Sequence, residues 1–138
     1  MEPSYKIIQK QSGVAEPTLS KGENFLIFLQ EVQATVKVLH LESRSRNMAT
    51  HQHLGVLYDE LNDLLDPLIE TYMGINGPIK TCICSKDSVE DVPMYLRECF
   101  NTIENTRNSI MYSFLQSQID LIQQSIAHCL YRLNFVKC

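Results

Sequence analysis

The feature that most constrains this chain is a long one-sided repeat in its middle. Seven side chains recur in alternating steps of three and four residues: His51, Leu54, Tyr58, Leu61, Leu65, Leu68 and Tyr72. Steps of three and four place side chains on a single stripe of an α-helix. The sequence therefore predicts one long helix that ends near Tyr72, and the fold class that it predicts is all-α.

Three further helices are expected. The first covers residues 22–41 and carries a second stripe: Phe25, Leu29, Val32, Val36 and His40. The third covers roughly residues 89–111, after a capping box formed by Ser88 and Asp91. The last follows a turn near residues 112–115, with Ser113 as its cap, and ends near Val136. Its stripe contains Ile119, Ile122, Ile126, Leu130 and Leu133.

The connections between these helices set the topology. Residues 42–47 form a short turn in which Ser45 or Asn47 is expected to cap the long helix. Residues 74–92 break the repeat with Gly74, Gly77 and Pro78. This stretch is too long for a tight turn and suits the crossover of a four-helix bundle, between its second and third helices. Residues 1–21 form a polar arm, and residues 22–138 form the bundle.

Four side chains are candidate metal ligands. His40 ends the first stripe, His51 begins the second, and Asp66 and Glu70 share a face because they are four residues apart. His53 lies about 200° around the helix from His51 and is expected at the surface.

The geometry of the long helix separates these ligands within one chain. His51 and Asp66 lie about 60° apart around the helix but about 22 Å apart along its axis, at about 1.5 Å per residue. A shared site therefore requires a second copy of the helix, antiparallel across a two-fold axis near Tyr58 and Asp59. Gly55 would let the two backbones approach.

This layout of two histidines followed by D-x-x-x-E resembles the ferroxidase site of Dps-type mini-ferritins. The resemblance implies a ferritin-like four-helix bundle, iron as the bound metal, and a homo-oligomer that closes into a hollow dodecamer. It also implies that His40 and His51 come from one subunit, and that Asp66 and Glu70 come from its two-fold mate. The chain differs from the family in having Gly55 where an acid is usual, a gap between the histidines that is one residue shorter, and Pro67 inside the acidic motif.

The sequence also resembles an uncharacterised group of small proteins from phages and large DNA viruses with the same layout. That resemblance implies a location in the host cytoplasm or in a virus particle.

Composition and motifs exclude several other classes. The net charge of -4 gives no general attraction to nucleic acid, so strong binding is not expected. No run of apolar residues is long enough to span a membrane. Five cysteines and no signal peptide indicate reduced thiols in a cytosol-like compartment. Cys82 and Cys84 lack the second ligand pair of a zinc site. No phosphate loop or nucleophile elbow is present.

Two functions remain open from the sequence. The first is an iron-binding, iron-oxidising mini-ferritin with metal sites shared between subunits. The second is a non-enzymatic structural or interaction protein, for example a virion component, in which the same side chains make polar interface contacts. Gly55 and Pro67 favour the second function, whereas the spacing of the four ligand-type residues favours the first.

Overall fold

The computed structural model describes residues 20–81 and 84–136, and within these ranges the protein is all-helical, with no strand. The four α-helices of these described ranges are α2 (Lys21–Glu42), α3 (Met48–Asn76), α4 (Val92–Thr106) and α5 (Ser113–Phe135). Short 3₁₀ turns, η1 (Ser43–Ser45) and η2 (Arg107–Ser109), follow α2 and α4. The prediction of an all-α bundle is confirmed. The predicted arm lies outside the described residues, except for Ser20 and for Lys21, which is the first residue of α2.

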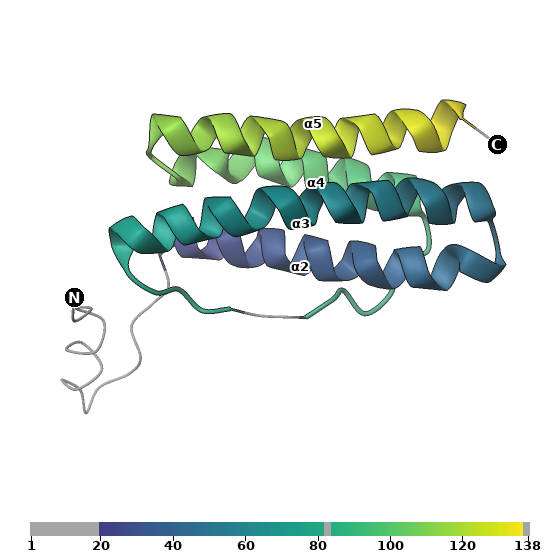
Figure 1. Ribbon diagram of the computed structural model, residues 1–138, viewed down its shortest axis with the longest axis horizontal. Coiled ribbons are helices and arrows are strands. Elements are labelled where there is room, and N and C mark those ends of the chain that lie inside the picture. The colour runs from purple at the N-terminus through teal and green to yellow at the C-terminus, as the bar shows by residue number, and fades with distance from the viewer. Residues whose placement is uncertain (1–19, 82–83, 137–138) are drawn as a thin grey trace.

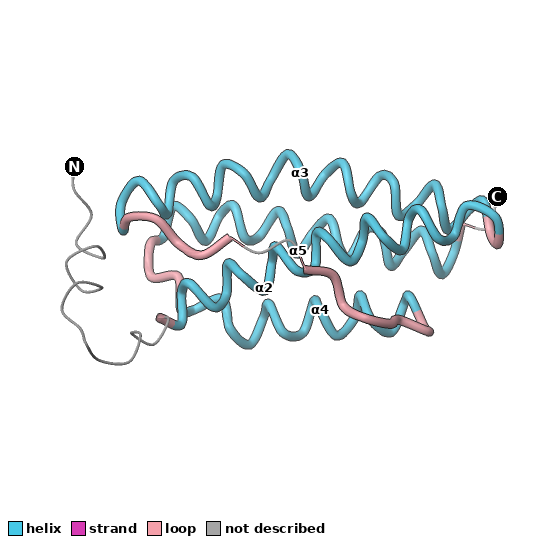
Figure 2. Tube along the Cα trace, turned by 90° about the horizontal axis from the view of Figure 1, so that it is seen from below, coloured by secondary structure: helices cyan, strands magenta, loops and turns pink. Residues whose placement is uncertain are grey.

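The four helices form a bundle in which α3 and α4 occupy opposite corners (Figures 1 and 2). Helix α3 packs against both α2 and α5, and α4 packs mainly against α5. Helices α3 and α4 run in the same direction, because the connection between them returns along the outside of α2 to the end at which α3 began (Figure 1). The amide of Lys86 in this connection donates to the buried hydroxyl of Thr35 on α2 at 2.9 Å. Neighbouring helices in the bundle are therefore antiparallel.

Local capping explains where the helices begin. Ser20 and Glu23 form a capping box at α2, and the side chain of Asn47 accepts from the amide of Thr50 at α3. The cap of α4 is Asp91, which accepts from the amide of Met94.

Two predicted boundaries are wrong. Helix α4 spans residues 92–106 and not 89–111. A start at residue 89 would put Pro93 inside the helix, whereas a start at Val92 puts it in the first turn, where its missing N–H costs nothing. Ser113 is the first residue of α5 and not its cap, since Tyr112 takes the cap position without a side-chain hydrogen bond.

Helix α3 is longer than predicted, with 29 residues that continue through Pro67 to Asn76. Proline removes the hydrogen bond to the carbonyl four residues earlier, here that of Asp63. Both residues are exposed, so water can bond to this carbonyl. Helix α3 ends at Gly77, whose φ of 90° is a conformation that favours glycine.

The predicted stripes form the core. Every stripe residue from Leu54 to Tyr72 except Tyr58 is buried, and so are the four apolar members of the first stripe. Helix α5 buries Ile119, Ile122, Ile126 and Leu130, while Leu133 packs against the core from a partly buried position. None of the described helices has both the length and the apolar character that crossing a membrane requires.

Arg107 joins α4 to α5 at their turn. Its guanidinium donates to the side-chain oxygen of Gln116 at 2.7 Å, to that of Gln123 at 2.5 Å, and to Asp120 at 2.5 Å. Gln116 donates in return to the carbonyls of Arg107 and Ile110. These bonds satisfy polar groups at the ends of the two helices.

We expect Arg107→Ala to lower the free energy of unfolding by about 1–3 kcal/mol, because it leaves the side-chain amide oxygen (Oε1) of buried Gln123 without this donor. Urea denaturation followed by circular dichroism measures the change. Arg97→Ala, at an exposed position of α4, is the matched control and should change stability by less than about 0.5 kcal/mol. Equal effects of the two substitutions would contradict the role of Arg107.

Candidate functional site

His40 and His51 form a stacked pair where α2 turns into α3. Their ring centroids are 4.0 Å apart and their planes differ by 8°. Nδ1 of His40 lies 2.7 Å from the carbonyl oxygen of His51, and Nδ1 of His51 lies 2.7 Å from the carbonyl oxygen of His40. The structure thus brings together two of the four predicted ligands, from two helices.

These hydrogen bonds fix the tautomer of both rings. A carbonyl oxygen only accepts, so Nδ1 must carry the proton and donate in each case. In a neutral imidazole the other nitrogen, Nε2, then carries a lone pair. Metal-binding histidines commonly have this arrangement, with one nitrogen on the metal and the other donating to a carbonyl or carboxylate. Nε2 is therefore the nitrogen of each ring that could bind a cation.

Gly55 makes room for this pair. A Cβ atom added at Gly55 would lie 2.8 Å from Cε1 and 3.2 Å from Nδ1 of His40. Contacts under about 3.0 Å essentially do not occur for real Cβ atoms, so any larger residue would displace the imidazole. Within one chain, the lack of a side chain at Gly55 thus leaves the space that the His40 ring occupies. Its predicted role in the approach of two α3 backbones stays a prediction.

Asp66 and Glu70 lie in the second half of α3, and both are exposed. Because α3 is one continuous helix, the 15 residues from His51 to Asp66 correspond to about 22 Å along the axis. Among the described residues, no group of three or more His, Cys, Asp or Glu side chains is close enough to hold a metal ion. One chain therefore presents the histidine pair and the two carboxylates as two separate groups of candidate ligands (half-sites).

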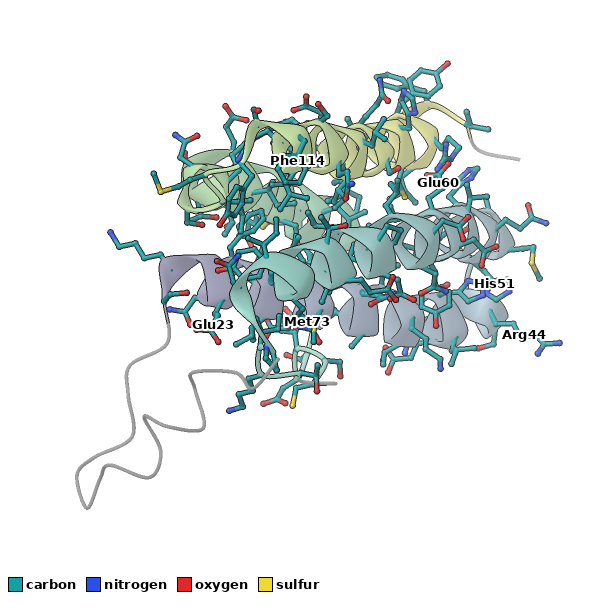
Figure 3. The ribbon with its side chains drawn as sticks, turned by 60° about the vertical axis from the view of Figure 1, so that its left-hand side comes forward. Glu23, Arg44, His51, Glu60, Met73 and Phe114 are labelled. Atoms are coloured by element: carbon teal, nitrogen blue, oxygen red, sulfur yellow. The ribbon has the colours of Figure 1, made fainter. Side chains whose placement is uncertain are left out.

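His51 and Arg44 are found at the same end of the hairpin formed by α2 and α3 (Figure 3). Along the same hairpin, a groove of about 480 Å³ is lined by Gln30, Gln33, Ala34, Lys37, Val38, Leu41, Tyr58 and Ser85. None of the four predicted ligands lines it, so the groove is not the candidate site.

The prediction that His53 lies at the surface is wrong. His53 is buried, with 8% of its surface exposed, and its Nε2 donates to the carbonyl of Val136 at 3.0 Å. The thiol of Cys129 on α5 lies 3.6 Å from the carbonyl oxygen of His53. The face of α3 opposite His51 is covered by α5, so His53 joins α3 to the end of α5 instead of meeting solvent.

Two of the described thiols are buried in the bundle. Burial raises the pKa of Cys99 to about 11, and burial also raises the pKa of Cys129 to about 11. A thiol with so high a pKa supplies little thiolate, so neither is a nucleophile or a ready metal ligand at neutral pH. Cys84 is exposed, and Cys82, the other half of the Cys-x-Cys pair, lies outside the described residues.

The comparisons place the chain in a family. Residues 40–133 match the family of unknown function DUF5856, so the chain belongs to that family. The matched segment contains all four predicted ligands. No curated protein and no solved structure gives a significant match.

We expect Gly55→Ala to destabilise the protein by about 1–3 kcal/mol, because the new methyl group overlaps the His40 ring. Gly74→Ala in the same helix is the matched control. Nothing lies within 4 Å of a Cβ atom at Gly74, so alanine there should stabilise the helix by up to about 1 kcal/mol. Thermal unfolding of both variants measures the changes. A change in stability of the same sign at both positions would contradict the packing of the His40 ring against Gly55.

We expect the fold to lose stability as the pH rises above about 9. The Cys99 and Cys129 thiols ionise near pH 8.5 in the unfolded chain, but only near pH 11 in the fold. The unfolded state then binds fewer protons than the native state, so the free energy of unfolding falls with pH. Denaturant titrations at pH 7.5 and 10 measure the loss, which the Cys99→Ser, Cys129→Ser double variant should reduce. An unchanged loss in that variant would contradict this origin.

Proposed function

We propose that this protein is a ferritin-like, iron-binding and iron-oxidising protein of the mini-ferritin type, acting as a homo-oligomer built through a two-fold. Each metal site would combine His40 and His51 of one chain with Asp66 and Glu70 of a second copy. Iron is the substrate of this reaction, and a closed shell of subunits, a dodecamer by resemblance, would store the oxidised product.

The observation that carries the proposal is the fixed histidine pair. Both Nδ1–H groups are used on carbonyls, which orients the rings and makes Nε2 the available nitrogen on each. The donor set of imidazole nitrogen and carboxylate oxygen suits iron that keeps open positions for an oxidant.

The topology and the half-sites support the same proposal. The long connection between α3 and α4, with antiparallel neighbours, is an arrangement that ferritin-like bundles use. Two copies of α3, antiparallel and centred near Tyr58 and Asp59, would place each histidine pair opposite the Asp66 and Glu70 of the other copy.

The chemistry that such a site would perform is a one-electron oxidation of each ferrous ion. Hydrogen peroxide accepts two electrons, one from each of two Fe²⁺ ions, and with two protons leaves as two water molecules. The carboxylates would stabilise the higher charge of Fe³⁺, while the neutral imidazoles hold the metal without adding charge.

A second candidate function is a structural or interaction protein that performs no metal chemistry, for example a component of a virus particle. One observation favours it. The two imidazole–carbonyl bonds also satisfy a carbonyl at the end of α2, so the histidines have a structural use of their own. In this case Asp66 and Glu70 would be polar contacts between subunits.

We expect Asp66→Ala to weaken Fe²⁺ binding by at least the roughly 10- to 100-fold that loss of an outer-shell partner costs, and to slow oxidation in proportion. Anaerobic titration calorimetry measures binding, and the rise in Fe³⁺ absorbance after addition of peroxide measures oxidation. His51→Ala should have the same effect from the other half-site.

Glu98→Ala is the matched control, since Glu98 is an exposed carboxylate on α4, away from the hairpin that carries the proposed ligands. It should bind and oxidise iron as the unaltered protein does. Iron binding that is unchanged in Asp66→Ala, or that is absent from the unaltered protein, would reject the mini-ferritin function and leave the structural one.

A further inference from the structure

Helix α3 carries charge of one sign only. It contains five carboxylates and no lysine or arginine (Asp59, Glu60, Asp63, Asp66 and Glu70). Asp59, Asp66 and Glu70 fall within about 60–100° of His51 around the helix, so they share a face with the histidine pair. All three are exposed. Glu60 lies about 180° from His51, on the side of α3 that is turned toward α5 (Figure 3).

The rest of the hairpin does not balance this charge. From α2 through α3, eight carboxylates stand against four basic side chains (Lys21, Lys37, Arg44 and Arg46). The carboxylates of α2 and its end are Glu23, Glu31 and Glu42. A second copy packed antiparallel over this face would bring Asp59 close to Asp59 of the copy, because the two-fold passes near it. Like charges brought together at an interface oppose association, and more strongly as water is excluded.

In their neutral form, the two rings of the histidine pair do not relieve this repulsion when the site holds no metal. Both Nδ1–H groups are already bonded within the chain, so neutral rings present lone pairs to the incoming carboxylates. The Nε2 lone pair and a carboxylate oxygen are both acceptors, so no hydrogen bond forms between them. A cation, by contrast, binds both the nitrogen and the oxygen.

One divalent cation in each site would be enough to neutralise the charge of the ligand carboxylates. A two-fold pair contains two sites, and two divalent ions carry four positive charges, equal in number to the Asp66 and Glu70 carboxylates of both copies. Exposed apolar side chains near the turn add attraction that does not depend on metal, chiefly Leu41, which is 58% exposed, and Met48, which is 54% exposed. Binding of the metal would remove the repulsion between the carboxylates and so allow this attraction to hold the two copies together.

We propose that pairing of two copies through the α2–α3 face is gated by the metal. The metal-free chain pairs only weakly through this face, and Fe²⁺ joins Nε2 of one histidine of the pair in one copy to Asp66 and Glu70 of the other. This inference rests on the proposed function and adds to it a control on assembly: the substrate metal builds the site that oxidises it.

The test is the mass of the full-length protein by sedimentation at micromolar concentration, first stripped of metal and then with Fe²⁺ under nitrogen. We expect Fe²⁺ to raise the association constant about 5- to 150-fold, the usual range of coupling between two binding events, and a chelator to reverse the effect. High salt should reduce the requirement for metal, because it screens the exposed carboxylates.

Asp59→Asn separates repulsion at the axis from metal binding, since Asp59 is not a proposed ligand. It should raise association of the metal-free protein about two- to fivefold, the effect of removing one exposed charge pair. Glu98→Gln on α4, which removes the same charge away from the hairpin, is the control and should leave association unchanged.

The outcomes distinguish this inference from the function on which it rests. If Fe²⁺ binds and the association constant does not change, metal gating is wrong, whether the protein is paired or single throughout, and the binding of iron stands. If no Fe²⁺ binds, the proposed function itself fails. If Asp59→Asn and Glu98→Gln act alike, the repulsion at the axis is wrong.

Discussion

The two reciprocal hydrogen bonds between His40 and His51 are the interaction on which the rest of the site depends. They close the turn between α2 and α3, satisfy a carbonyl at the end of α2, and hold the rings in a parallel stack. The stack exists only because Gly55 leaves space beneath the ring of His40. The contacts that stabilise this end of the bundle are therefore the same contacts that decide which nitrogen each ring presents.

The length of α3 keeps the histidine pair and the two carboxylates of one chain apart. A continuous helix of 29 residues is a rigid spacer, so no side-chain rotation brings Asp66 or Glu70 to the histidines of the same chain. Either the two half-sites serve separate purposes, or a neighbouring copy unites them. A site shared between two copies would be complete, and able to bind its metal, only after the copies pair. The carboxylates of α3 would then oppose assembly without metal and favour it with metal.

The sequence predicted the parts of the fold that depend on one periodic stripe. The apolar members of the stripes of α2 and α3 are buried as expected, because each helix turns one face to the bundle centre. His53 was misplaced because α3 is covered on two sides, by α2 and by α5, and a single stripe describes only one of them. The predicted start of α4 is wrong because Ser88 and Asp91 match a capping box, whereas Pro93 fits only the first turn of a helix and so places the start at Val92. The packing of His40 against Gly55 is a contact between α2 and α3, and the spacing of residues within one helix does not predict such a contact.

The choice of imidazole at both positions bears on the function. A structural bond to a carbonyl needs only a donor, which serine, asparagine and glutamine also provide. Imidazole differs because it offers, beyond that donor, a lone pair on the far side of a rigid ring. Two such rings, stacked in parallel and each with its donor already used, form a pair of fixed Nε2 atoms for which the described contacts of the chain have no use. The structural requirement explains the Nδ1–H groups, and under the proposed function the remaining nitrogens would hold a cation shared with a second chain.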